Sequence, residues 1–309
     1  MTATPIIFSG SSHPDLAQEI ATLLSTSLGK RDLHLFPDKE IFVELLEPVQ
    51  GRHVFVLQTL GSDPNFHLME LFIILDALKR ASAASLTVVA PYYGYARQDR
   101  LDKPGVPISA KLIANLLTKA GIDHLITMDL HSEQIEGFFD IPVEHLLSRT
   151  LLIPYCSSLN LENVVVVAPD KGGIKIASAY SKQLNVPIAL VDKERLDSFQ
   201  VEMRLFVGDV KGKTVLLTDD MCSTGGTLVH AAHVCAQLGA KKIIAVIGHG
   251  LFIENALERI EKSPIEMLIT TNSISIPEKV RSHPKIHVVS IAPLLSEAIA
   301  HSSLPYSCG

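Results

Sequence analysis

Several features that would narrow the function of this chain are missing from its sequence. It has no tryptophan and only 6 % aromatic residues, and its four cysteines, Cys156, Cys222, Cys235 and Cys308, include no C-x-x-C pair. This cysteine pattern argues against a zinc ribbon or a disulfide framework. No apolar run approaches the ~20 residues that a membrane helix needs, so we expect no membrane association.

An excess of positive charge is also missing. The chain carries 27 Lys and Arg residues against 33 Asp and Glu residues, a formal net charge of −6. This balance argues against nucleic acid as a partner. The first residues contain no basic region followed by a long apolar one, so we expect no secretory signal peptide and a cytoplasmic, reducing environment.

What the sequence does contain is a regular alternation of segments typical of strands and helices. Its 309 residues are 47 % hydrophobic, which suits an α/β protein of two ordinary domains. Alternating strands and helices predict mainly parallel sheets flanked by helices. We expect two such units joined near residue 147, one spanning 1–147 and the other 148–309.

The stretch KTVLLTDDMCSTGGTLVHAAHVCAQ, which begins at Lys213, has the clearest local organisation. Val215–Thr218 reads as a short buried strand, and Asp219 and Asp220 follow where that strand is expected to end. Ser223–Thr227 is a polar turn with two glycines, and apolar residues recur at helical spacing from Leu228. The expected unit is a strand, paired carboxylates, a glycine-rich turn and a helix N-terminus.

Such a turn suits an anion, because backbone N–H groups at a helix N-terminus are unpaired and the helix dipole favours negative charge there. Gly225 and Gly226 let the backbone approach the anion, and Thr224 and Thr227 add hydroxyl donors. The two aspartates suit the hydroxyls of a ribose, or a metal ion. A ribose 5-phosphate group therefore fits this turn. No lysine follows the glycines, so it is not a Walker A loop. The alternative is an N-capped turn with solvated aspartates.

Four segments together resemble one protein family. TDDMCSTGGT resembles the loop of type I phosphoribosyltransferases that binds 5-phosphoribosyl 1-diphosphate (PRPP). With PYYGYARQDR, TMDLHSEQ and APDKGG, the resemblance narrows to the ribose-phosphate diphosphokinases, or PRPP synthetases, and runs from near Pro5 to near Ala300. It implies that both units have the type I phosphoribosyltransferase fold. It also implies that a C-terminal helix near Pro293–His301 packs on the first unit.

The resemblance implies that two segments of the first unit bind ATP. Phe36 would stack on adenine, Asp38 and Glu40 would bind base or ribose hydroxyls, and the family delivers this loop across a subunit interface. We therefore expect a dimer-based homo-oligomer, and specifically a hexamer. Taken alone, the two segments read as a charged turn and a solvated rim. The implied ATP-binding residues are Phe36, Asp38, Lys39, Glu40, Arg97, Gln98, Asp99 and Arg100.

The resemblance also implies a magnesium cofactor and a pair of catalytic cations. His131 and Asp170 match the family's Mg²⁺ ligands, although Mg²⁺ by itself prefers oxygen to imidazole. Lys193 and Arg195 match two cations that the family places on a mobile catalytic loop. An isolated Lys-Glu-Arg segment is otherwise usually a solvated turn.

The implied reaction moves the diphosphoryl group of Mg-ATP to O1 of D-ribose 5-phosphate. Lys171 and Ser223 look more like archaeal-type members than bacterial ones. Two alternatives remain: a phosphoribosyltransferase that consumes PRPP, and a non-catalytic regulatory relative. The residues that the resemblance assigns to ribose 5-phosphate are Arg195, Asp219, Asp220, Ser223, Thr224, Gly225, Gly226 and Thr227.

Overall fold

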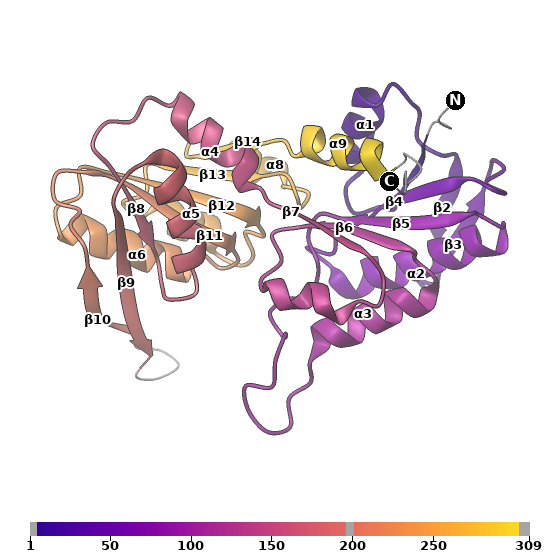
Figure 1. Ribbon diagram of the computed structural model, residues 1–309, viewed down its shortest axis with the longest axis horizontal. Helices are drawn as coiled ribbons and strands as arrows, with labels where there is room; N and C mark the ends of the chain where they lie inside the picture. Colours follow the sequence, from indigo (N-terminus) through magenta and orange to yellow (C-terminus); the bar gives the residue numbers. More distant parts are fainter. Residues whose placement is uncertain (1–4, 196–200, 303–309) are drawn as a thin grey trace, which may run out of the picture. The chain divides into compact units, whose positions relative to one another are not determined.

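The structure is a computed structural model that describes residues 5–195 and 201–302. The chain divides into two compact units (Figure 1). Unit 1 comprises Met1–Leu147, Ser273–Ser275 and Ser290–Gly309, and unit 2 comprises Ser148–Asn272 and Ile276–Val289. No helix in the described ranges is both long enough and apolar enough to cross a bilayer.

Unit 1 is built on a five-stranded sheet in which every neighbouring pair is parallel. Its strands are rich in β-branched and apolar residues and are mostly buried on both faces, as parallel strands between helices are. The order across the sheet is β1 (Ile6–Ser9), β4 (His53–Leu57), β5 (Ser85–Ala90), β6 (His124–Met128) and β7 (Val143–Leu146).

Helices cover both faces of this sheet. In Figure 1, α2 (Pro64–Arg80) and α3 (Ser109–Ala120) lie on one side, and α1 (Pro14–Leu23) and α9 (Ala292–Ser302) pack together on the other. The helix starts follow from local chemistry. Proline stands at the first position of α1 and α2, where its missing N–H is not needed. The side chains of the residues before them, His13 and Asp63, accept backbone N–H groups of the first turn.

Two further elements of unit 1 lie outside this sheet. β2 (Arg31–Leu35) and β3 (Ile41–Leu45) form a separate two-stranded antiparallel ribbon. A 3-10 helix, η1 (Glu133–Phe138), follows β6 and packs near α3. Both elements carry or support segments that the sequence marks as candidate site residues.

Unit 2 is built on a seven-stranded sheet that is parallel except at one edge, where β10 runs antiparallel to β9. Its helices are α4 (Arg149–Ser158), α5 (Ile174–Leu184), α6 (Gly226–Gln237), α7 (Ala256–Glu261) and α8 (Glu278–Arg281). The strand order is β10 (Val201–Val207), β9 (Ile188–Arg195), β8 (Val164–Ala168), β11 (Thr214–Cys222), β12 (Lys242–Gly250), β13 (Met267–Thr271) and β14 (Ile286–Val289).

The alternation of side chains along the central strands separates two cores in unit 2. Val165 and Val167 of β8 pack in a cluster with residues of α6, such as Leu228. Val166 of the same strand packs in a second cluster with α4 and α5 residues, such as Tyr180. Successive strand residues point to opposite faces, so a run of valines can feed both clusters.

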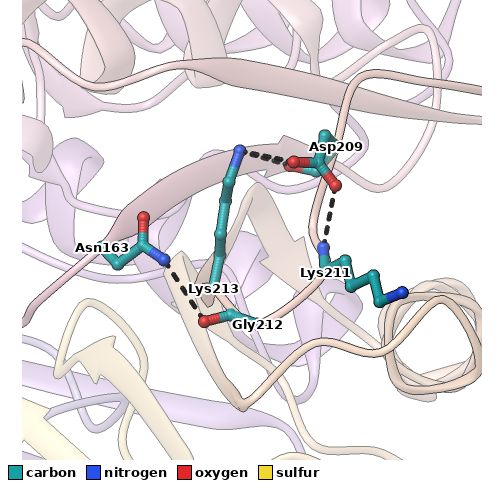
Figure 2. Close-up of polar contacts among 5 residues, drawn as sticks. All are labelled: Asn163, Asp209, Lys211, Gly212 and Lys213. Carbon is teal, nitrogen blue, oxygen red and sulfur yellow. Dashed lines mark hydrogen bonds and ion pairs between the residues drawn. The ribbon is translucent and has the colours of Figure 1, made fainter.

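A compact set of polar contacts fixes the start of β11, the strand that carries the aspartate pair (Figure 2). Asp209 accepts the backbone N–H of Lys211 at 3.0 Å and pairs with Lys213 Nζ at 3.0 Å. The Asn163 side chain donates to the carbonyl of Gly212 at 3.3 Å. These contacts tie the turn before β11 to the segment before β8, which sets the relative register of the two strands.

Candidate active site

The paired aspartates lie inside β11 rather than beyond its end, so the expected strand boundary at Thr218 was wrong. β11 pairs with β8 only as far as Leu217, but it continues alongside β12 to Cys222. In that extension Asp219 pairs with Ile247. The neighbouring strand β12 is itself long, and it holds the acidic residues in extended backbone. Where β8 stops, the edge of β11 at residues 218–222 is no longer paired with β8.

The electrostatics of this edge are unfavourable for negative charge. Burial raises the pKa of Asp219 well above its ordinary value, and the charges of Asp220 and Asp170 add to the rise. Asp219 also accepts the backbone N–H of Asp220 at 3.0 Å. Burial likewise raises the pKa of the Cys222 thiol to about 12, so this cysteine is not a nucleophile at neutral pH. A bound cation, or hydroxyl groups that donate hydrogen bonds to these carboxylates, would offset the repulsion between them.

The turn after β11 has the geometry of an anion site. Gly225 adopts a left-handed conformation, with φ of 74°, directly before the first residue of α6, and no side chain caps this helix. The turn is anchored from the segment after β12. Backbone N–H groups of Leu251 and Ile253 donate to the carbonyls of Cys222 and Ser223, at 2.9 and 3.1 Å. The first backbone N–H groups of α6 therefore lie beside a turn that the segment after β12 holds in place. This is the arrangement in which a helix N-terminus binds a phosphate.

Asp170 follows β8 and is bonded to the turn that leads into the next helix. Its Oδ1 accepts the backbone N–H groups of Gly172 at 2.9 Å and Gly173 at 3.3 Å, just before α5. These bonds hold the carboxylate on the same edge of unit 2 as Asp219, whose pKa its charge raises. The backbone N–H groups of Gly172 and Gly173 therefore bind the Asp170 carboxylate.

His131 lies in unit 1, in the loop after β6. The loop turns sharply because Asp129 has a φ of 42°, an uncommon value for a residue other than glycine. His145 of β7 fixes the conformation of this loop. Its Nε2 accepts the backbone N–H of Leu130 at 2.9 Å, and its Nδ1 lies 2.5 Å from Glu136 Oε1. Because Nε2 is an acceptor, the ring proton is on Nδ1 and is donated to Glu136.

Replacing His145 with phenylalanine should lower the free energy of unfolding by about 1–3 kcal/mol, because the buried N–H of Leu130 then lacks an acceptor. Urea denaturation followed by circular dichroism measures the loss. Glu136→Gln is the matched control, since its amide oxygen still accepts the proton of His145, and it should cost less. Equal losses in the two variants would contradict this account of the loop.

The first group of expected ATP-binding residues lies at the tip of the β2–β3 ribbon. The tip is a tight turn: Phe36 N–H donates to the Glu40 carbonyl at 2.8 Å, and Lys39 N–H donates back to the Phe36 carbonyl at 2.8 Å. Asp38 accepts the N–H of Glu40 at 3.1 Å. Phe36 is 43 % exposed and meets Phe42 edge to face. The ribbon therefore presents an aromatic ring and charged groups together at one exposed tip.

The second group follows β5 in the loop that leads to α3. Arg97 and Arg100 are exposed, Asp99 is half-buried and accepts the Gln134 side chain at 2.9 Å, and the Gln98 side-chain oxygen accepts from Ser109. Asp99 and Gln98 thus help to shape the loop. In the part of unit 1 that the structure describes, no hydrogen bond joins this group to the ribbon tip.

Lys193 and Arg195 occupy the end of β9 (Ile188–Arg195), and the segment that follows Arg195 lies outside the described residues. β9 and β10 form an antiparallel hairpin in which Lys193 is opposite Met203 and Arg195 is opposite Val201. The polar composition of this segment gives little strand signal, and β9 forms a strand because it pairs with β8 on one edge and with β10 on the other. Residues 193 and 195 are alternate positions of this strand.

The donor set at the edge of unit 2 suits Mg²⁺. No group of three His, Cys, Asp or Glu side chains in the described ranges is arranged to hold a metal alone. Mg²⁺ sites in phosphoryl-transfer enzymes use one or two carboxylates together with substrate phosphates, so a protein-only cage is not required. Asp170 offers oxygen ligands beside the crowded Asp219, which fits a cation brought in with its substrate.

Two contributions to the site gave no signal in the sequence. The backbone of residues 251–253 supports the glycine turn, and Arg259 Nη1 donates to the Thr224 carbonyl at 3.2 Å. Arg259 is 35 residues from Thr224 along the chain. Helical periodicity marks it only as an exposed position, so the contact emerges from the tertiary fold.

Comparison with known proteins places this geometry in context. Residues 5–121 match a family model described as the N-terminal domain of ribose phosphate pyrophosphokinase, and residues 201–303 match the phosphoribosyl synthetase-associated domain. Ribose-phosphate pyrophosphokinase of Clostridium perfringens is 47 % identical over 296 residues, 95 % of this chain and 92 % of that protein. The Chromobacterium violaceum protein of the same description is 44 % identical over 295 residues, 95 % of this chain and 90 % of that protein.

A solved structure is similar over almost the full length. The crystal structure of phosphoribosylpyrophosphate synthetase from Mycobacterium smegmatis superposes with a TM-score of 0.91 at 39 % sequence identity. The alignment covers 97 % of this chain and 98 % of that one. With this coverage the similarity spans both units.

Proposed function

The chain belongs to the ribose-phosphate pyrophosphokinase family, and we propose how its residues carry out the reaction that makes PRPP for nucleotide biosynthesis. The enzyme transfers the diphosphoryl group of ATP to D-ribose 5-phosphate, and each unit has the type I phosphoribosyltransferase fold. O1 of the ribose attacks the β-phosphorus, the bond from that phosphorus to the oxygen it shares with the α-phosphate breaks, and AMP leaves. The O1 proton passes to solvent.

The observation that supports this proposal best is the turn at the end of β11. Ribose 5-phosphate places its phosphate at the first turn of α6, where Gly225 turns the backbone and no side chain caps the helix. Ser223, Thr224, Gly226 and Thr227 complete the phosphate cradle. The phosphate is then bound by hydrogen-bond donors and the sugar by carboxylate acceptors, which fixes one orientation of the substrate.

The sugar end lies against the crowded carboxylates. Asp219 and Asp220 accept hydrogen bonds from the ribose hydroxyls, which compensates carboxylates that are otherwise in an unfavourable electrostatic environment. Arg195 of the β9–β10 hairpin also contacts ribose 5-phosphate, while Lys193 closes on the transferring group. Transfer of this kind depends on positioning and charge stabilisation rather than on covalent catalysis.

ATP is bound by the two exposed groups of unit 1. Phe36 stacks on the adenine ring, and Asp38, Lys39 and Glu40 contact the base and ribose. From the second group, Arg97 and Arg100 present guanidinium forks suited to phosphate oxygens. Gln98 and Asp99 shape that loop and add contacts to ATP.

The ground for an oligomeric enzyme is the resemblance to the family, in which the loop of Phe36 is delivered across a subunit interface. The ribbon tip of one subunit completes the nucleotide site of another in a dimer-based homo-oligomer, a hexamer being the expected form. The metabolic role of the family supports a cytoplasmic location. No nucleic acid partner and no membrane are needed for this activity.

Magnesium serves as the cofactor, with His131 and Asp170 as its protein ligands. When bound, the ion neutralises the phosphates of ATP and lowers the cost of the charge that develops during transfer. Asp170 supports this assignment through its oxygen ligands at the crowded edge of unit 2. His131 is supported by its place in a loop that His145 and Glu136 hold in shape.

His131→Ala should raise the Mg²⁺ concentration that gives half-maximal activity, because one ligand is lost while the β6 loop keeps its backbone contacts. Activity is measured across an Mg²⁺ titration at fixed ATP. His53→Ala is the matched control, since His53 is an exposed histidine of unit 1 bonded to Ser85. An unchanged Mg²⁺ dependence in His131→Ala would remove this residue from the metal site.

The location of the substrates is tested by hydrogen–deuterium exchange with mass spectrometry. Ribose 5-phosphate should protect peptides that cover residues 219–228, and an unreactive ATP analogue should protect those that cover 36–40 and 97–100. Ribose without its phosphate should protect the first region much less, because the α6 turn then has no anion. Protection by ribose 5-phosphate that excludes residues 219–228 would refute the proposed site.

A further inference from the structure

Arg259 lies beside the turn that receives the phosphate, although it belongs to a different element. It is an exposed residue of α7, and its Nη1 donates to the Thr224 carbonyl at 3.2 Å. The position that a β-carbon would take on Gly226 lies 3.9 Å from the same nitrogen. The guanidinium therefore flanks the first residue of α6 and binds the turn that leads into it.

The position of α7 against this turn is well defined. The backbone N–H of Ile253 donates to the Ser223 carbonyl at 3.1 Å, two residues before Asn255, which precedes α7. Ala256, the first residue of α7, is fully buried, and its carbonyl oxygen lies 3.7 Å from the β-carbon position of Gly225. Arg259 thus projects from a support that is fixed to the turn at two points.

Arg259 forms no ion pair with a carboxylate in the described part of the chain. The nearest acidic residue along α7, Glu258, pairs instead with Lys262 at 2.5 Å. One hydrogen bond to Thr224 uses one of the five N–H donors of a guanidinium.

We propose that Arg259 is a positioning residue for ribose 5-phosphate. It holds the Thr224 carbonyl so that the 223–226 turn keeps the shape of a phosphate cradle, and it places a positive charge beside that cradle. The proposal rests on the ribose 5-phosphate site described above. Because the Thr224 carbonyl is at the surface and water can replace the arginine there, the role concerns substrate affinity rather than folding.

Arg259→Gln should raise the KM for ribose 5-phosphate about tenfold, the effect of losing one charge-assisted hydrogen bond. The kcat and the KM for ATP should stay within about twofold, since the proposed role of Arg259 concerns the phosphate end of the sugar and not O1. Arg259→Lys keeps the charge but loses the planar fork, so it should fall between the parent and Arg259→Gln. Arg281→Gln on α8 removes an exposed arginine of the same unit and should leave every constant unchanged.

Steady-state kinetics and thermal melts on these variants decide the proposal. A KM effect on ribose 5-phosphate alone supports it. Equal losses in kcat, in both KM values and in melting temperature would reveal a purely structural role and overturn it. An equal effect of Arg281→Gln would reveal a general charge effect and also overturn it.

A second variant distinguishes an error in the role of Arg259 from an error in the ribose 5-phosphate site. Thr227→Val alters the cradle directly, so it should raise the KM for ribose 5-phosphate if the substrate binds there. A Thr227→Val effect without an Arg259→Gln effect would overturn the role of Arg259 only. If neither variant changes this KM, the ribose 5-phosphate site itself is misplaced and the inference falls with it.

Discussion

Replacing Lys193 with alanine should lower kcat by about 10³- to 10⁵-fold, the effect of a comparable cation in other phosphoryl-transfer enzymes. Negative charge moves toward the departing AMP only as the bond to the β-phosphorus breaks. An ammonium group at this point therefore stabilises the transition state more than the ground state, and the loss is expressed in kcat. Each KM should change much less, because residues 219–227 and the Arg97–Gln98 pair bind the substrates.

Two further variants make the Lys193 experiment specific. Lys193→Arg retains a cation on the same strand and should recover part of the activity. Lys211→Ala removes an exposed lysine side chain from the turn before β11 and should behave as the parent (Figure 2). The β9–β10 pairing is a main-chain ladder, so the melting temperature should hardly move. A kcat of Lys193→Ala within tenfold of the parent would mean that Lys193 is not the catalytic cation.

Asp219→Asn should have two opposite effects. It should raise the KM for ribose 5-phosphate about 10- to 100-fold, because hydrogen bonds from the ribose hydroxyls to a charged acceptor are lost. It should also make the substrate-free protein more stable at neutral pH. Burial and the charges of Asp220 and Asp170 make ionised Asp219 costly in the folded state, and asparagine removes that cost. The amide oxygen still accepts the N–H of Asp220.

The pH dependence of the added stability follows from the sign of the pKa shift. The pKa of Asp219 is higher in the folded state than in the unfolded chain, so the folded state binds the proton more tightly. Ionisation then destabilises the fold progressively as the pH rises above the ordinary aspartate value of 3.8. The stability gained by Asp219→Asn should therefore be absent near pH 3 and increase as the pH rises above 3.8. It should stay constant above the pKa that Asp219 has in the folded state.

Asp209→Asn supplies the control for charge removal. The hydrogen bond from Lys213 lowers the pKa of Asp209, which is the opposite direction, so this variant should gain no stability at neutral pH. Melting temperatures measured from pH 3 to pH 8 compare the two variants. A lower melting temperature for Asp219→Asn at pH 7, or an unchanged KM for ribose 5-phosphate, would contradict the proposed role of the aspartate.

The sequence predicts the central elements well where hydrophobic pattern and local caps agree. Val164–Ala168 begins with four valines, a composition that favours a buried strand, and it forms β8. The residues of α3 have apolar side chains at helical spacing, and the helix ends at Gly121, which adopts a left-handed φ of 98° as glycine commonly does at a helix end. In these segments the local signal and the tertiary environment favour the same structure.

The sequence is less informative where tertiary contacts override local composition. The polar residues of β9 and β10 form strands because each supplies the other's hydrogen-bonding edge. Asp219 and Asp220 are poor strand formers, yet β12 holds them in extended conformation. The same limit applies to the site. The Arg259 contact with Thr224 and the raised pKa of Asp219 depend on groups that are brought together only by the fold.

The most direct test of the account is to identify the nucleotide product of the reaction. The purified protein is incubated with Mg-ATP and ribose 5-phosphate, and products are followed by phosphorus NMR. The account predicts AMP and PRPP in equal amounts, with no reaction when ribose 5-phosphate is omitted. Formation of ADP with ribose 1,5-bisphosphate, or no turnover of ATP by the folded protein, would contradict transfer of an intact diphosphoryl group.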